Sequence, residues 1–119
     1  MFRTNLSLTV RKVHKGMVIV DISGDVTAAA EGSLMETLIT TKAEGVRVIV
    51  LNFSGLAYMN SSGIGMLVTF LIRANRQSQR VVAYGLNEHY RQIFDLTKLN
   101  EVIHVYDTEA DVLAGEAVS

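Results

Sequence analysis

The sequence contains no cysteine, no proline and no tryptophan among its 119 residues. Without cysteine there is no disulfide framework, no thiol chemistry and no cysteine metal site. The three histidines, His14, His89 and His104, are scattered along the chain without the spacing of metal ligands. We therefore expect a protein that holds no metal and no other cofactor.

An excess of one charge and long apolar runs are also missing. Eleven basic and twelve acidic residues give a net charge of −1, which predicts no electrostatic footprint for nucleic acid or for an anionic membrane. No apolar run is long enough to cross a bilayer, and the N-terminus lacks a basic start followed by an apolar segment. These observations predict a soluble, cytoplasmic protein with no nucleic-acid partner and no direct membrane insertion.

The motifs that accompany common catalytic sites are absent as well. There is no Gly-x-x-x-x-Gly-Lys-Ser/Thr loop for phosphates, and Gly63-Ile64-Gly65 lacks the rest of a dinucleotide-binding pattern. No serine lies in a Gly-x-Ser-x-Gly turn. Asp21 and Asp25 form a close pair of carboxylates, but their place at a predicted strand end favours a role in the turn. Nothing in the sequence argues for an enzyme.

What the sequence does contain is a strand, a polar turn and a helix between residues 46 and 72. Residues 46–53 are rich in β-branched side chains, as expected of a strand covered on both faces. After the turn, apolar residues recur at helical spacing and predict a helix with one buried face: Ile64, Leu67, Val68, Leu71 and Ile72. Asn60, Ser61 and Ser62 lie at the start of this helix, where they can cap free backbone N–H groups.

Strands and helices alternate along the rest of the chain. Alternation over residues 6–10 and an apolar run over 17–22 flank the Lys15-Gly16 turn, which predicts an antiparallel hairpin. Three more helices are expected, each behind a capping side chain: one to about residue 43 after Asp25 or Thr27, one after Asn87 and one after Thr108. The first of these should bury its apolar residues, which are Leu34, Met35, Leu38 and Ile39.

Two further strands are expected at residues 81–84 and 102–106. Buried strands that alternate with helices require crossover connections, and hence a largely parallel sheet with helices on its faces. The sequence therefore predicts a single domain over residues 1–119 of the α/β (α+β) class. It should contain a mixed sheet of four to five strands and about four helices.

Four segments follow the pattern of one known family, in order and at similar spacing. Residues 56–65, Leu-Ala-Tyr-Met-Asn-Ser-Ser-Gly-Ile-Gly, closely resemble its signature, and residues 48–52 resemble its central strand. Residues 22–25 resemble the exit of its second strand, and residues 91–99, ending in Leu-Thr-Lys-Leu, resemble its third helix. The family is the STAS domain (sulfate transporter and anti-sigma factor antagonist), and the resemblance implies its fold over nearly the whole chain.

The resemblance also implies a function. Unphosphorylated anti-sigma factor antagonists of this family bind a serine kinase of the histidine-kinase-like ATPase type, which is also the anti-sigma factor, and so release a sigma factor. The kinase phosphorylates a serine of the signature, which breaks the binding, and a serine phosphatase restores it. By position that serine is Ser61, with Ser62 as the fallback. The partner-binding residues implied are Asp25, Thr27, Met59, Asn60, Ser61, Ser62, Gly63 and Ile64.

Two positions depart from the family pattern. The residue before the phosphorylated serine is usually aspartate, and here it is Asn60. Thr27 stands where the family commonly has a carboxylate near the partner-binding surface, which predicts a different choice of partner. Met59 belongs to the implied surface, although a packing role is favoured for its side chain.

Two other classes of function stay open at this point. One is a STAS adaptor that is not phosphorylated, within a signalling scaffold or a transporter complex, in which Ser61 and Ser62 serve only as helix caps. The other is a nucleotide-binding protein or enzyme that uses the loop before the helix as an anion site. Against the second, that loop carries no lysine and no metal-binding carboxylate.

Overall fold

The structure is a computed structural model that describes residues 5–116; the predicted domain of residues 1–119 also includes seven residues outside this range. Five strands form one sheet in the order β1-β2-β3-β4-β5. The strands are β1 (Leu6–His14), β2 (Met17–Val26), β3 (Val48–Met59), β4 (Arg80–Tyr84) and β5 (His104–Tyr106). The first pair is antiparallel and all others are parallel, which confirms the predicted hairpin and mixed sheet.

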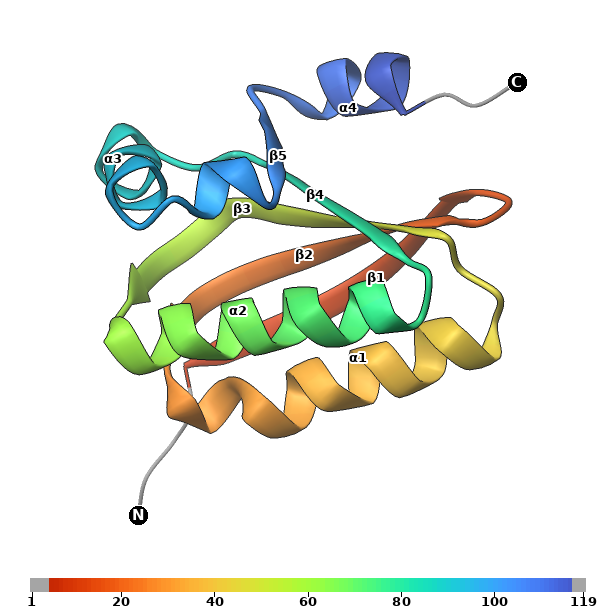
Figure 1. The fold of residues 1–119 in the computed structure, drawn as a ribbon, viewed down its shortest axis with the longest axis horizontal. Helices are drawn as coiled ribbons and strands as arrows, with labels where there is room; N and C mark the ends of the chain where they lie inside the picture. Colours follow the sequence, from red (N-terminus) through yellow and green to blue (C-terminus); the bar gives the residue numbers. More distant parts are fainter. Residues whose placement is uncertain (1–4, 117–119) are drawn as a thin grey trace.

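Four helices and two short 3-10 turns connect or follow the strands. They are η1 (Ala28–Ala30), α1 (Glu31–Ala43), α2 (Ser61–Arg76), α3 (Glu88–Leu96), η2 (Leu99–Glu101) and α4 (Glu109–Gly115). Successive parallel strands lie side by side in chain order, so right-handed crossovers place their helices on the same face of the sheet. In Figure 1, α1 and α2 run side by side along the sheet, and α4 lies beyond β4 and β5.

Alternation along the strands divides the core into two clusters. The larger one lies between the sheet and α1, α2 and α3, and its fully buried side chains include Val20, Leu51, Phe70 and Phe94. The smaller one lies on the other face, where α4 contributes Val112. Its remaining buried members come from the sheet: Met17, Ile19, Val50, Val82 and Tyr84.

The central strand is longer than the sequence predicted. β3 continues through the expected polar turn to Met59, so that Asn60 alone separates it from α2. β2 likewise continues beyond its expected end at residues 23–25, and the two strands stay paired, with Asp25 opposite Tyr58 and Val26 opposite Met59. The pairing satisfies backbone groups that a loop would have left to water.

The apolar faces of the helices also differ in part from the prediction. On α2 the buried side is formed by Gly63, Leu67, Phe70, Leu71 and Ala74. The exposed fractions of Val68 and Ile72 are 37% and 49%, so these two lie outside the core.

On α1, Leu34 and Leu38 are buried as expected, whereas Ile39 is 70% exposed. Thr37 and Thr41 take its place in the buried face, and each hydroxyl donates to the carbonyl four residues earlier. These internal hydrogen bonds make the burial of two threonines acceptable.

The predicted caps are confirmed in most cases. Asn87 and Thr108 accept hydrogen bonds from the first turns of α3 and α4. Thr27 accepts from Ala29 N at 3.2 Å and so caps η1, while α1 itself has no side-chain cap. Asp25, the alternative cap, lies within β2.

Candidate functional site

The carboxyl ends of β2 and β3 and the start of α2 bring the predicted site residues together. The parallel register sets Asp25 and Val26 beside Tyr58 and Met59. Asn60 N donates to Val26 O at 3.4 Å, which closes the step from β3 into α2 against the end of β2. The segment containing Asp25 and Thr27 therefore lies next to the start of α2. The family resemblance implied that these two parts of the chain belong to one partner-binding surface.

Asn60 is the N-cap of α2. Its backbone is extended (φ −94°, ψ −179°), and its side-chain Oδ1 accepts a hydrogen bond from Gly63 N at 2.8 Å. Ile64 N donates to the Asn60 carbonyl at 3.0 Å. Asparagine caps helices about as well as aspartate, so the departure from the family pattern leaves the local geometry intact.

Gly63 is required by a close approach between α2 and β2. A Cβ atom added to this residue would lie 2.0 Å from the carbonyl oxygen of Val26. Real Cβ atoms do not come so close to backbone, so any side chain here would push the start of α2 away from the sheet. Gly63 thus fixes the height at which the two serines stand above the strand ends.

Met59 is 4% exposed and packs into the larger core, so its side chain is not available to a partner. Its backbone N donates to the hydroxyl of Tyr90 on α3 at 2.8 Å. The Tyr90 hydroxyl thus holds the end of β3 to α3. A buried tyrosine usually finds a hydrogen-bond partner, but the sequence does not indicate which one.

Ser61 and Ser62 are the first two residues of α2, and both are exposed. Because Asn60 performs the capping, neither hydroxyl is needed to start the helix. The N–H groups of a helix's first turn point outward and carry partial positive charge. Ser61 and Ser62 are therefore exposed in a local environment that tolerates a negative group.

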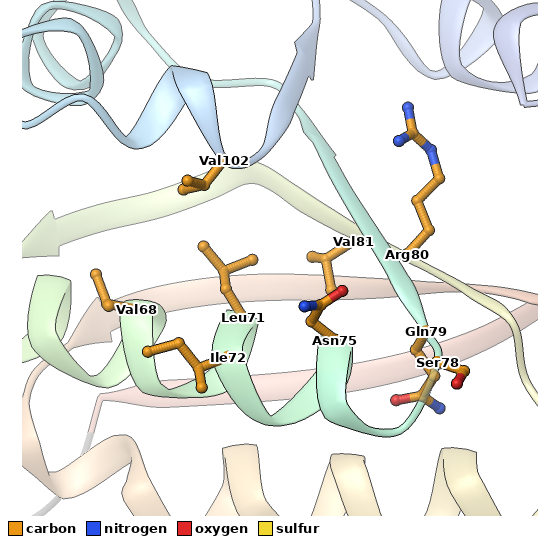
Figure 2. Close-up of a pocket in the computed structure, with 9 residues that line it drawn as sticks. All are labelled: Val68, Leu71, Ile72, Asn75, Ser78, Gln79, Arg80, Val81 and Val102. Atoms are coloured by element: carbon orange, nitrogen blue, oxygen red, sulfur yellow. The ribbon is translucent and has the colours of Figure 1, made fainter.

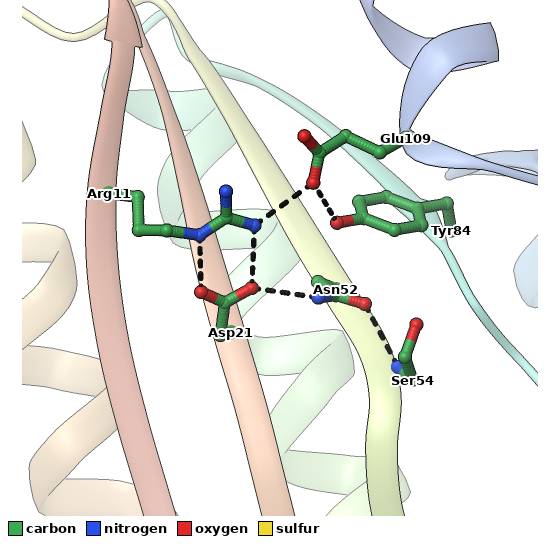
Figure 3. Close-up of polar contacts among 6 residues, drawn as sticks. All are labelled: Arg11, Asp21, Asn52, Ser54, Tyr84 and Glu109. Atoms are coloured by element: carbon green, nitrogen blue, oxygen red, sulfur yellow. Dashed lines mark hydrogen bonds and ion pairs between the residues drawn. The ribbon is translucent and has the colours of Figure 1, made fainter.

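A second polar cluster lies on the opposite face of the sheet and holds α4 in place (Figure 3). Arg11 on β1 forms a bidentate pair with Asp21 and also donates to Glu109 Oε1 at 3.0 Å. Tyr84 donates to the same Glu109 oxygen at 2.7 Å. Asn52 donates to Asp21 Oδ1 at 2.7 Å. The predicted turn role of Asp21 is therefore wrong, since Asp21 is a mid-strand ion-pair partner.

The pKa values of this cluster follow its hydrogen bonds. Those from Arg11 hold the pKa of Asp21 below its usual value, and those from Tyr84 and then Arg11 lower the pKa of Glu109. Burial, followed by the bond to Glu109, raises the pKa of Tyr84 to about 12. Each charge faces an opposite charge or a donor, so we assign the cluster to the structure and not to catalysis.

A groove runs along the other side of α2, between that helix, β4 and the segment after η2 (Figure 2). It has a volume of about 740 Å³, and Val68, Ile72 and Val102 form its apolar rim. Figure 2 shows Val102 facing Val68 and Leu71 across it. Val68 and Ile72, which the sequence placed on the buried face of the helix, thus line this groove instead.

Over residues 5–116, no three histidine, aspartate or glutamate side chains are grouped so as to hold a metal ion. In the same part of the chain, no helix is both long and apolar enough to cross a bilayer.

These features define a class: a mixed-sheet α/β domain whose candidate site is an exposed, hydroxyl-bearing helix start beside two parallel strand ends. The sequence profile of the STAS domain matches residues 9–112, and the chain belongs to this family. The family resemblance drawn from the sequence is thereby confirmed.

Two relatives that are similar in sequence are named anti-sigma-B factor antagonists. The anti-sigma-B factor antagonist of Staphylococcus epidermidis is 27% identical over 92 residues, covering 77% of this chain and 85% of that protein. That of Staphylococcus aureus (strain NCTC 8325 / PS 47) is 27% identical over 86 residues, covering 72% and 80%.

Solved structures resemble the fold closely. An anti-sigma factor antagonist from Mycobacterium paratuberculosis has a TM-score of 0.78 at 18% identity, covering 95% of both chains. The Bacillus cell fate determinant SpoIIAA in its phosphorylated form has a TM-score of 0.69 at 19% identity, covering 92% of this chain and 98% of that one. These likenesses confirm the predicted fold class.

Proposed function

We propose that this protein is an anti-sigma factor antagonist whose binding surface is switched off by phosphorylation of Ser61. The observation that carries the proposal is the exposure of Ser61 at the start of α2, beside the end of β2. The Staphylococcus relatives named as anti-sigma-B factor antagonists support the antagonist role over that of a transporter or scaffold adaptor.

In the unphosphorylated form, the partner contacts the edge built from Asp25, Thr27, Asn60, Ser61 and Ser62. Asp25, Thr27 and Asn60 are partly exposed and the two serines are exposed. Ile64, one turn into α2, extends this surface with a half-buried apolar side chain. Met59 and Gly63 support the surface from below, because both are buried.

Phosphorylation adds a charge of about −2 and three acceptor oxygens to Ser61. Free N–H groups and the helix dipole at the start of α2 stabilise that charge, so the domain keeps its fold. A partner packed over Ser61 would instead bury an uncompensated dianion, which is costly. Binding is therefore lost without refolding.

The partner that this scheme requires is an anti-sigma factor that is also a serine kinase of the histidine-kinase-like ATPase type. A serine phosphatase returns the protein to its binding form. Thr27 on the surface, in place of a carboxylate, alters the charge that the partner must match. Selectivity among such kinases therefore depends on residue 27.

The test compares adjacent serines. Wild type, Ser61→Ala and Ser62→Ala are purified from the native host, and phosphate is located by peptide fragmentation in the mass spectrometer. We expect phosphate on Ser61 in wild type and Ser62→Ala, and none in Ser61→Ala. Absence of phosphate from wild type under all growth conditions would contradict the switch and favour a constitutive adaptor.

A second arm measures binding to the cognate anti-sigma factor. Ser61→Glu should weaken binding at least about tenfold, since a charge placed in the interface costs more than 1.4 kcal/mol. Ser61→Ala, which adds no charge to the interface, should bind much more tightly than Ser61→Glu. Equal binding by Ser61→Glu and wild type would place Ser61 outside the interface.

A further inference from the structure

The small net charge conceals an uneven distribution of cations. Three segments, residues 12–16, 42–48 and 73–80, contain seven lysines and arginines and a single glutamate. All seven are exposed, and together they form a basic pole: Lys12, Lys15, Lys42, Arg47, Arg73, Arg76 and Arg80. The expectation from net charge, that no electrostatic footprint exists, therefore does not describe the surface.

The fold brings these three segments to one end of the molecule. Gly16 O, in the β1–β2 turn, accepts from Arg47 N at 2.8 Å and Val48 N at 3.0 Å, and Arg80 N donates to Arg47 O at 2.8 Å. Figure 1 shows the β1–β2 turn and the C-terminal ends of α1 and α2 at the same end of the long axis. The start of α2, with Ser61, lies at the opposite end, about 24 Å away along the helix.

Among the residues that the structure describes, most of these cations are free of ion pairs. Lys12 pairs with Glu44 at 3.6 Å and Arg80 with Glu116 at 2.8 Å. Within residues 5–116, the other five cations of the basic pole form no ion pair. Lys42, Arg73 and Arg76 also compensate the C-terminal dipoles of α1 and α2, but each dipole end amounts to only about half a charge. An excess of about four positive charges remains.

From this distribution we infer that the basic pole is a docking surface for the anionic headgroups of a lipid bilayer. Clusters of four to eight lysines and arginines attract anionic lipid surfaces without inserting. The cations lie in or next to three connections between elements, at one end of a molecule 45 Å long, so several of them reach a flat surface together. Lipids rearrange to meet such a convex tip, whereas a protein partner would need a matching shape.

Nucleic acid is the less favoured occupant. The three segments contain no phenylalanine, tyrosine or tryptophan on which bases of a single strand could stack. The β1–β2 hairpin at the basic pole is not a free two-stranded ribbon, because β2 is also paired with β3, so the sheet would have to enter the major groove of a duplex with it. Binding through the basic pole leaves Ser61 facing away from the bilayer, so it holds the protein at the membrane whether or not Ser61 is phosphorylated.

The experiment is flotation of the full chain with vesicles at about 50 mM and about 300 mM salt. Phosphatidylcholine vesicles with about one third phosphatidylglycerol are compared with pure phosphatidylcholine. We expect binding to the anionic vesicles only, and its loss at high salt. The pole variant Lys42→Glu/Arg47→Glu should bind at least about tenfold more weakly.

The matched control is Arg91→Glu/Lys98→Glu, which changes the net charge equally at residues outside the basic pole. It should retain most vesicle binding, and circular dichroism checks that both variants are folded. Equal losses in the two variants would overturn the inference, because net charge alone would then explain the binding. So would failure of wild type to float at low salt, or binding to duplex DNA in preference to vesicles.

Ser61→Glu separates this inference from the proposed switch. It should float with anionic vesicles like wild type even though it loses the anti-sigma factor. Loss of flotation in Ser61→Glu would mean that vesicles bind the end that carries Ser61 and not the basic pole.

Discussion

The two faces of the sheet are held by different forces. The face under α1, α2 and α3 buries a continuous apolar cluster that includes Phe53, Phe70 and Phe94, with Phe53 and Phe94 in edge contact at 6.1 Å. The other face is covered by α4, a helix of seven residues. Only one residue of α4, Val112, is fully buried among the apolar side chains beneath it.

Hydrogen-bonded charges fix both ends of α4. Glu109 binds Arg11 and Tyr84, and Glu116, four residues from Val112, binds Arg80 through two oxygens. A short helix buries too little area to be oriented by apolar contact alone, and directional ion pairs supply the orientation. The stability of the first face should therefore respond to changes in side-chain volume, and that of the second face to changes in charge and pH.

The strongest test of the first face is Phe70→Ala. Phe70 is 0% exposed, and removing a buried phenyl ring leaves a cavity that costs about 3–5 kcal/mol in the free energy of unfolding. Ile72→Ala, on the exposed side of the same helix, should cost less than about 1 kcal/mol. Urea unfolding followed by circular dichroism measures both. Similar losses in the two variants would mean that the assigned face of α2 is wrong.

Gly63 and Gly65 offer a sharper test, because they lie in the same helix with a single residue between them. Alanine at position 63 would meet the Val26 backbone at 2.0 Å, whereas alanine at 65 has nothing within 4 Å. We expect Gly63→Ala to cost about 1–3 kcal/mol and Gly65→Ala to stabilise by about 0.5–1 kcal/mol. Thermal unfolding measures both, and stabilisation by Gly63→Ala would contradict the close approach.

The sequence was sufficient for the elements whose signals are local. The β-branched run before Asn60 and the apolar period after it predicted β3 and α2, and the polar residue at the junction is the N-cap. The family pattern implied that Asp25 and Thr27 belong to one surface with Ser61, and the parallel register sets Asp25 opposite Tyr58, three residues before Ser61. Local signals thus located the candidate site within a few residues.

Features that depend on distant residues were not predictable. Apolar spacing indicates that a helix is amphipathic but not which neighbours cover it, so Ile39 and Ile72 were assigned to the core although both are exposed. The pair between Arg11 and Glu109 joins residues 98 positions apart. Likewise, the basic pole exists only because three separate turns meet at one end.

The second face should respond to pH through Glu116. Hydrogen bonds from Arg80 lower its pKa below the usual value, against the effect of burial. A lowered folded-state pKa means that the stabilisation is complete above the unfolded-state pKa and is lost as pH falls through the folded value. At neutral pH, Glu116→Gln should cost about 1–2 kcal/mol because it removes charge-assisted bonds, and this difference from wild type should shrink as pH falls below 4.5.

Glu36→Gln on α1 is the matched control, since Glu36 is exposed and forms no ion pair within residues 5–116. It makes the same change in net charge and should leave the stability at neutral pH nearly unchanged. Urea unfolding at several pH values measures all three proteins. A constant difference between wild type and Glu116→Gln from neutral pH to pH 3 would show that the carboxylate charge of Glu116 does not hold α4, and that both faces rely on packing alone.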